Sequence, residues 1–261
     1  MGEKRDMIYQ YKAGQSFFHG LDPITKFGWL IGVSLLALLF DTGLTQLILL
    51  AVIMIMGRTL AGLTWHEMWR GMRIPFWFGL PYFLLQLLFL PGDSVLYQIG
   101  SFHLTIEAID YAAAITLRFV TLVLASLLYI ISTDPRHVVL ALAQKLKVPY
   151  RFAFAISIAL RFLPILEAEA ATIQSAQRMR GLSMPTGWID KFYWWKSFVI
   201  AIFIHAVRRV GQIADGMDMK GFGAYPDRTY VHMLEVTKKG IVFVAISGLI
   251  TLMAIIVWIL Y

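Results

Sequence analysis

Two short basic signals are the residues of this chain best suited to binding chemistry. They read Met179-Arg180-Gly181 and Met219-Lys220-Gly221, and each closes a long segment of helical character. Glycine just after the last helical residue adopts a left-handed conformation without a steric penalty, and a cation in the last turn faces the negative end of the helix dipole. Taken singly, either signal could be an ordinary helix cap. As a pair, they are interpreted as two helix ends that each present a basic side chain outward.

Catalytic, metal-binding and nucleotide-binding patterns are absent from the sequence. There is no cysteine, and the six histidines do not stand at metal-ligand spacing. His66-Glu67 resembles half of a zinc-protease signature, but position 70 is an arginine where the second histidine would stand. The phosphate-binding pattern Gly-x4-Gly-Lys-Ser/Thr is missing too. We therefore predict no catalytic residue, no metal site and no cofactor.

Arg118 is a basic residue inside a long apolar stretch. Charge at membrane depth is costly, so such a residue is a candidate for function or for a specific partner. Asp110 and Glu107 lie on the same predicted helix and could pair with it, or its side chain could face the interior of the helix bundle. We expect a structural role for Arg118.

Composition is typical of an integral membrane protein. Of the 261 residues, 59% are hydrophobic and 15% are charged. The net charge of +7 could indicate nucleic-acid binding, but basic cytoplasmic loops beside an anionic leaflet explain it better in a membrane chain. The lipid bilayer, and not nucleic acid, is the expected surrounding.

Five apolar segments are predicted to cross the membrane, at 27–40, 44–56, 74–90, 104–131 and 240–260. The first two are short for the ~20 residues of a crossing, so they are either two crossings or one re-entrant hairpin. Of the 23 lysines and arginines, all but Arg118 fall in 1–26, 57–73 and 134–239. Because basic loops stay in the cytoplasm, the N-terminus is predicted to be cytoplasmic and Tyr261 external.

A large helical insert separates the fourth and last segments. Ser132-Thr133-Asp134-Pro135 is a strong helix start, and Val148-Pro149 ends the amphipathic segment that follows. Two longer helices are predicted at 150–181 and 190–220. Near the other end of the chain, Asp22 can cap a helix whose first residue is Pro23.

Two glutamates, Glu167 and Glu169, lie within the first of these longer helices. They could form a carboxylate pair for acid–base catalysis. At positions i and i+2, however, they face different sides of a helix. Pairing with Arg161 or with basic residues on the lipid side is therefore favoured.

Several stretches resemble the transmembrane T component of energy-coupling-factor (ECF) transporters, a family that includes cobalt and biotin permease subunits. That family carries an Ala-Arg-Gly signal at the end of each of two cytoplasmic coupling helices. Here the signals differ at the first position in both copies, and the second has lysine in place of arginine. Residues 20–26, 132–149 and 160–167 are similar to further family segments.

The resemblance implies an all-α integral membrane protein with about five transmembrane helices and a cytoplasmic coupling domain of long amphipathic helices in a V. The expected divisions are 1–133, 134–239 and 240–261. Six residues would dock ATPase subunits and three would support the coupling helices: Met179, Arg180, Gly181, Met219, Lys220 and Gly221, with Pro135, Arg161 and Pro164 in support.

The partners that the resemblance implies are two ABC-type ATPase subunits and a membrane substrate-binding S component. The chain would then be the scaffold of a vitamin or metal-ion importer in a prokaryotic cell membrane. A membrane-embedded enzyme or assembly factor with cytoplasmic helices is the alternative.

Overall fold

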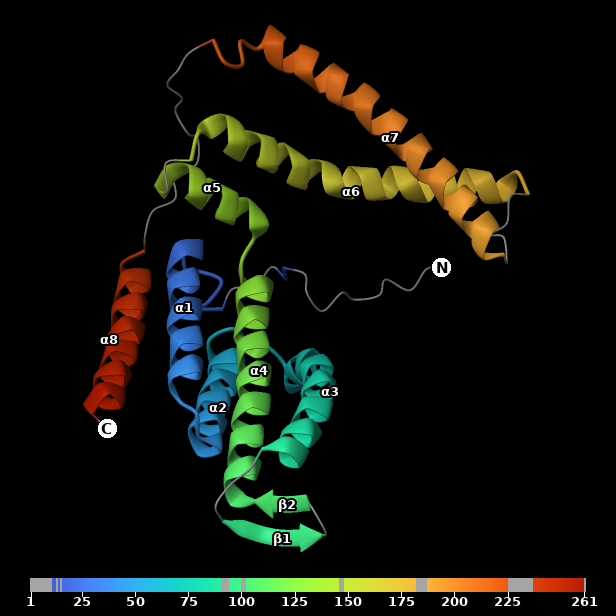
Figure 1. Ribbon diagram of the computed structural model, residues 1–261. Coiled ribbons are helices and arrows are strands. Elements are labelled where there is room, and N and C mark those ends of the chain that lie inside the picture. Colours follow the sequence, from blue (N-terminus) through green and yellow to red (C-terminus); the bar gives the residue numbers. More distant parts are fainter. Residues whose placement is uncertain are drawn as a thin grey trace. The chain divides into compact units, whose positions relative to one another are not determined.

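The computed structural model describes residues 11–12, 14, 16–90, 94–99, 102–145, 148–181, 187–224 and 237–260. The described elements are, in chain order, α1 (Pro23–Leu39), α2 (Gly43–Thr59), α3 (Trp65–Phe89), β1 (Val95–Ile99), β2 (Phe102–Thr105), α4 (Ile106–Ser132), α5 (Pro135–Lys145), α6 (Tyr150–Met179), α7 (Trp188–Met219) and α8 (Lys238–Leu260) (Figure 1). They fall into two compact units, residues 1–141 with 234–261, and residues 142–233.

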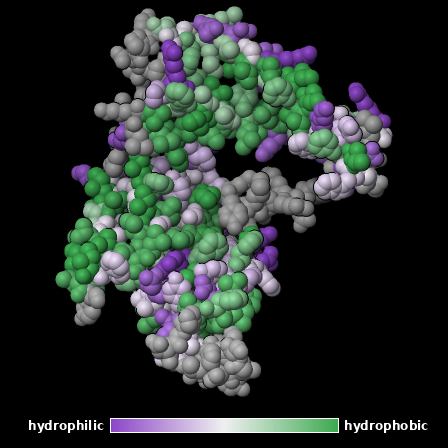
Figure 2. Space-filling model, in the orientation of Figure 1, coloured by the Kyte–Doolittle hydropathy of each residue, from purple (hydrophilic) through white to green (hydrophobic). Residues whose placement is uncertain are grey.

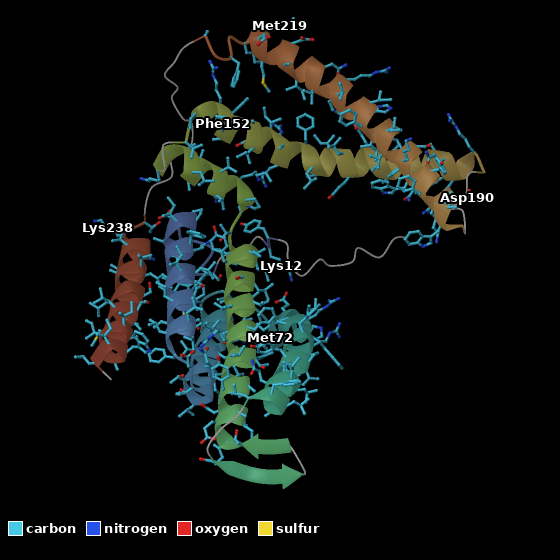
Figure 3. The ribbon with its side chains drawn as sticks, in the orientation of Figure 1. Lys12, Met72, Phe152, Asp190, Met219 and Lys238 are labelled. Carbon is cyan, nitrogen blue, oxygen red and sulfur yellow. The ribbon has the colours of Figure 1, made fainter. Side chains whose placement is uncertain are left out.

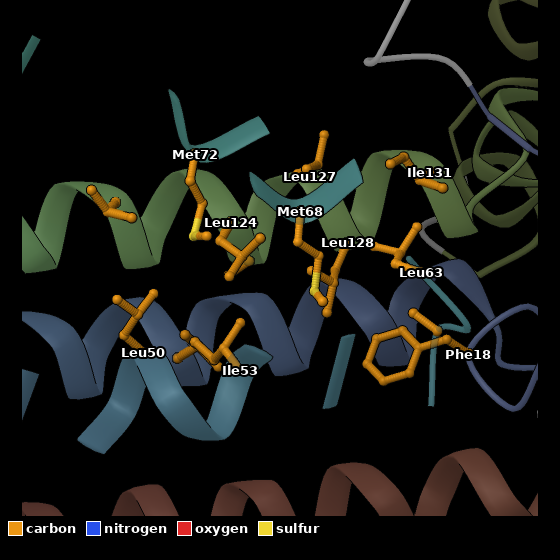
Figure 4. Close-up of a cluster of buried hydrophobic side chains, with 14 of the residues drawn as sticks. Phe18, Leu50, Ile53, Leu63, Met68, Met72, Leu124, Leu127, Leu128 and Ile131 are labelled. Carbon is orange, nitrogen blue, oxygen red and sulfur yellow. The ribbon is translucent and has the colours of Figure 1, made fainter. Parts of the chain in front are cut away.

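Helix α4 is the centre of the first unit, where it packs against α1, α2 and α3. Its buried face is made mainly of alanine, leucine, valine and isoleucine at helical spacing. Figure 4 shows Leu124, Leu127, Leu128 and Ile131 of this helix together with Leu50, Ile53, Leu63, Met68, Met72 and Phe18. Burial of these apolar side chains holds the four helices together.

Helix α8 packs against α1 through small residues. A Cβ atom added to Gly32 would lie 3.1 Å from the Thr251 hydroxyl oxygen, which is closer than ordinary van der Waals contact. Gly28 faces Val244 in the same interface. Glycines spaced four apart let two helix backbones approach closely, as is common between helices in membranes.

Four of the described helices are long and apolar enough to cross a membrane, namely α3, α4, α7 and α8. Three of them correspond to the segments predicted at 74–90, 104–131 and 240–260. Helices α1 and α2 have 17 residues each and are shorter. Helix α7 qualifies by length and composition, although the sequence places it in the coupling region, and none of its residues is buried.

Two boundaries differ from the predicted ones. Helix α3 begins at Trp65, because Thr64 and Glu67 form a reciprocal capping box there, so the basic aromatic stretch is part of the helix. The fourth segment begins as a strand, since β2 pairs antiparallel with β1 and Ile99 lies opposite Phe102. Short apolar runs do not distinguish strand from helix by pattern alone, so the hairpin was missed. Apart from it, the helical membrane architecture is confirmed.

Arg118 has the structural role that we expected, but of the alternatives for its side chain, pairing with Asp110 or Glu107 on its own helix is not the one found, because it binds across helices. Its guanidinium donates to the Phe40 carbonyl at 2.9 Å and lies 2.5 Å from a carboxylate oxygen of Asp41. Asp110 instead accepts the backbone N–H of Gly43 at 2.9 Å. Two side chains of α4 therefore hold both sides of the turn between α1 and α2.

This geometry predicts that Arg118→Met destabilises the chain. The substitution removes a charge-assisted hydrogen bond to the Phe40 carbonyl, and such a bond is worth on the order of 1.5–3 kcal/mol. The thermal midpoint of the purified chain in detergent should fall by several degrees. Arg136→Met is the control, because its ion pair with Asp134 is long, at 3.4 Å, and Arg136 is 76% exposed. Equal shifts in the two variants would contradict the role of Arg118.

Candidate functional site

Helix α6 ends at the first basic signal with the predicted glycine cap. Arg180 is the capping residue, with φ −80° and ψ 7°, and Gly181 follows with φ +80°. The Gly181 N–H donates to the Arg178 carbonyl at 3.0 Å. This bond and the left-handed glycine satisfy a terminal carbonyl and stop the helix.

Helix α7 ends in the same way at the second signal. Lys220 has φ −90° and ψ 9°, and Gly221 has φ +69°. The Gly221 N–H donates to the Asp218 carbonyl and the Phe222 N–H to the Met217 carbonyl, both at 3.0 Å. These two bonds make a complete Schellman motif. The prediction of a glycine cap at both signals is confirmed.

Both signals present their side chains to solvent. Met179 is 83% exposed and Met219 is 89% exposed. Arg180 and Lys220 are exposed as well, and within the described residues neither cation has a hydrogen-bond or ion-pair partner. Each helix end therefore offers a thioether and a free cation side by side.

The second unit, 142–233, holds these two ends apart. Figure 1 shows α7 crossing α6 near the C-terminal end of α6, with the two basic ends at opposite sides of the pair. Figure 3 labels Asp190 and Met219 near the two ends of α7. A helix of 32 residues measures roughly 48 Å at 1.5 Å per residue, so the two cations are tens of Å apart.

An ion pair and a ring stack are among the contacts that join α6 to α7. Glu169 forms the ion pair with Arg209, so of the partners that we favoured Arg161 is not the one that Glu169 takes. At the other side of the pair, the rings of Phe154 and Phe222 stack with centroids 4.6 Å apart. The residue that completes the cap of α7 thereby also contacts α6.

The three residues predicted to support the coupling helices lie elsewhere. Pro135 is the first residue of α5, where Asp134 accepts the Arg136 N–H at 2.8 Å. Arg161 and Pro164 are exposed in the middle of α6, which continues through the proline. Pro164 is sixteen residues before Arg180, or roughly 24 Å along a helix. Arg161 and Pro164 are therefore well separated, along α6, from the basic end of that helix.

The exposed apolar surface of α7 is a feature that sequence reasoning understated. Figure 2 shows apolar side chains at the surface of the α6–α7 pair. Trp188, at the start of α7, is 91% exposed, and Phe203, further along the helix, is 66% exposed. Near Trp188, a hollow of about 470 Å³ is lined by aromatic side chains and Lys191. The hydropathy of residues 188–219 was the available signal, because no water-soluble helix needs so many exposed apolar residues.

Among the described residues, no three His, Asp or Glu side chains gather as candidate metal ligands. What the site offers is binding by two exposed cations and an apolar surface.

Comparison with known proteins places the chain in a family. Residues 14–232 match the family of the cobalt transport protein CbiQ. The chain is 30% identical over 259 residues to the energy-coupling factor transporter transmembrane protein EcfT of Leuconostoc gelidum subsp. gasicomitatum, covering 96% of each chain. It is 30% identical over 260 residues to EcfT of Lacticaseibacillus paracasei, covering 94% of this chain and 95% of the relative. With EcfT of Bacillus subtilis it shares 29% over 245 residues, covering 89% and 91%.

The family match covers most of the chain and includes both basic signals. The chain therefore belongs to the CbiQ family and is a transmembrane T component of energy-coupling-factor transporters.

Proposed function

We propose that this chain is the coupling scaffold of an ECF-type ABC importer. The two basic helix ends dock two ABC-type ATPase subunits, and the α6–α7 pair passes their movement to a membrane substrate-binding S component. One observation carries the proposal. Two helices with the same glycine-capped end each present an exposed methionine and a free cation, at opposite sides of one crossed pair.

Docking follows from the chemistry of the two ends. The guanidinium of Arg180 has a planar fork of donors that can bind a carboxylate or carbonyls bidentately, whereas the ammonium of Lys220 is a point charge. Two weak sites on one rigid support gain avidity when both are occupied, provided that their spacing matches the two partners. The crossed pair supplies that spacing.

Transmission follows from the way the pair is held together. The Glu169–Arg209 ion pair and the Phe154–Phe222 stack make α6 and α7 move together. The exposed apolar face of α7 is the proposed contact for the S component. Pro135, Arg161 and Pro164 are proposed to keep the coupling helices in shape, and residues 134–239 to form the coupling domain between 1–133 and 240–261.

Uptake of a vitamin or a metal ion across a prokaryotic cell membrane is the proposed task, with ATP hydrolysed by the partners. The name of the matched family, cobalt transport protein, supports the metal-ion alternative, and the name of the relatives, energy-coupling factor transporter transmembrane protein, supports transport. The aromatic start of α7, with Lys191 and Lys196, suits the membrane interface, where tryptophan, tyrosine and lysine concentrate.

The docking proposal predicts an order among variants. Arg180→Ala should weaken ATPase binding by on the order of 1.5–3 kcal/mol, the worth of a charge-assisted bond. Lys220→Ala should cost less, Lys220→Arg should be tolerated, and the double alanine variant should lose both binding and uptake. The measurement is copurification of the ATPases alongside substrate uptake in cells.

Arg178→Ala is the matched control for this order, since Arg178 is an exposed cation in the last turn of the same helix. If Arg178→Ala weakens ATPase binding as much as Arg180→Ala does, the effect comes from the net charge of the helix end and not from Arg180 itself. Full binding and uptake in the double variant would make both ends ordinary helix caps.

The cap geometry gives a second prediction. Gly221→Ala forces a Cβ into the left-handed conformation at φ +69°, which costs about 1 kcal/mol, and should loosen the cap that positions Lys220. Gly211→Ala is its control, because Gly211 lies inside α7 with nothing within 4 Å of an added Cβ, and alanine there should stabilise the helix by about 0.5–1 kcal/mol. ATPase copurification should fall for the first variant only, and a fall in both would refute a specific cap.

Orientation gives a third prediction. A topology reporter fused after Tyr261 should lie outside the cell, and one inserted at Pro185 should lie in the cytoplasm, because the basic residues of 134–239 stay inside. Both positions fall outside the described residues. An external reporter at Pro185 would be incompatible with ATPase docking at Arg180.

A further inference from the structure

The first turn of α1 binds a distant part of the chain through Asp22. As the sequence predicts, Asp22 is the N-cap residue and Pro23 the first residue of α1, but the Asp22 side chain bonds none of that helix's own amides. One of its carboxylate oxygens instead accepts the backbone N–H of Thr237 at 3.1 Å. Thr237 directly precedes α8, so Asp22 holds the residue where that helix begins.

Lys26, one turn further along α1, binds a second distant point. It is 1% exposed, and its ammonium donates to the Ser132 carbonyl at 2.7 Å. Ser132 is the last residue of α4, where terminal carbonyls lack helical partners and carry the negative end of the dipole. A buried cation requires such a partner, so Lys26 is tied to the end of α4.

These two points lie shortly before the chain leaves the first unit, after residue 141, and shortly after it returns, at residue 234. That unit comprises residues 1–141 and 234–261, and α6 and α7 belong to the other. The way out runs from Ser132 into α5, and the way back reaches α8 at Thr237. The first turn of α1 therefore binds the chain near both of its connections to the second unit.

The contact between this turn and α8 is tight. The Thr25 hydroxyl donates to the Asp22 carbonyl at 2.7 Å, which fixes the Thr25 side chain. A Cβ added to Gly240 would lie 3.2 Å from the Thr25 methyl carbon and 3.6 Å from the Asp22 carboxylate. Gly240 is buried, and its missing side chain lets the first turn of α8 lie directly against α1.

We propose that Asp22 and Lys26 form a fixed clamp, defined by their bonds to Thr237 and Ser132. Through this clamp the first unit receives movement from the coupling helices α6 and α7. With both connections anchored to one rigid turn, a displacement of the coupling helices moves α1, α4 and α8 as one body. Without the clamp, the same displacement frays the end of α4 or the start of α8. The inference rests on the proposed coupling function, and both residues are positioning residues.

Other buried polar bonds lack this placement and supply a control. Gln46 is fully buried, and its amide donates to the carbonyls of Ala37 at 2.7 Å and Phe40 at 2.6 Å. It joins α2 to the end of α1 and touches neither connection. Loss of Gln46 should lower stability without affecting transmission.

The first test measures substrate uptake per ATP hydrolysed, in proteoliposomes that hold the whole transporter with its two ATPases and S component. Lys26→Met and Asp22→Ala should each lower this ratio by about tenfold, the equivalent of one charge-assisted bond. Asp22→Asn should keep the ratio, because the asparagine side-chain oxygen still accepts from Thr237. Gln46→Leu should lower the thermal midpoint and leave the ratio unchanged.

The outcomes separate the clamp from the function on which it rests. A wild-type chain that binds no ATPase would overturn the proposed function, and the clamp with it. A wild-type complex that transports, with unchanged ratios in the Lys26→Met and Asp22→Ala variants, would overturn the clamp alone. If Lys26→Met does not assemble, the clamp is still tested by the uptake per ATP hydrolysed in Asp22→Ala compared with Asp22→Asn. Equal ratios in these two variants would overturn it.

A disulfide tests whether the clamp stays closed during transport. The chain has no cysteine, so Thr25→Cys with Gly240→Cys creates one defined pair, and a Cβ atom at position 240 would lie 3.2 Å from the Thr25 methyl carbon, close enough for two cysteine side chains to meet. Oxidation of the double variant should leave uptake within about twofold of the reduced form, a difference well below that of one lost bond. Each single-cysteine variant, treated with the same oxidant, is the control. Loss of uptake only in the oxidised double variant would show that the contact must open, which would overturn a fixed clamp.

Discussion

The first unit depends on satisfying the backbone groups at its helix ends. The terminal carbonyls and amides of a helix lack an intrahelical partner and need one from elsewhere. Here charged side chains of one helix supply partners for the ends of another. Arg118 binds the end of α1, Asp110 the start of α2, Lys26 the end of α4, and Asp22 the residue before α8. Each such charge is neutralised in part by the helix end that it binds.

The second unit solves the same problem differently, and the difference bears on function. At the ends of α6 and α7, glycine in the left-handed conformation satisfies terminal carbonyls with backbone amides alone. The side chains of the adjacent Arg180 and Lys220 are therefore not needed to cap these helices. The charged side chains at the helix ends of the first unit bind other parts of the chain, whereas Arg180 and Lys220, at the ends of α6 and α7, remain available to partners.

An apolar exterior and a scaffold role are compatible in such a protein. No apolar residue of α7 is buried within the described chain, and the relatives are by name transmembrane proteins of energy-coupling factor transporters. Under the proposed function, lipid and partner chains supply the remaining contacts of this surface. The chain's own bonds need only hold α6 to α7 and the membrane helices to one another, which the Glu169–Arg209 pair and the core around Leu128 do.

The sequence alone determined the membrane character, the family, both glycine-capped ends and the helices between them, because hydropathy and capping are local properties. It also predicted Asp22 and Pro23 at the start of α1. The tertiary structure decided what the charged side chains bind: Arg118 pairs with Asp41 at a separation of 77 positions, and Lys26 reaches Ser132 across 106. Local pattern carries no information on such partners, since they depend on which helix ends packing brings together. For the same reason the β1–β2 hairpin was missed, because pairing between strands, rather than composition, separates a short apolar strand from a helix.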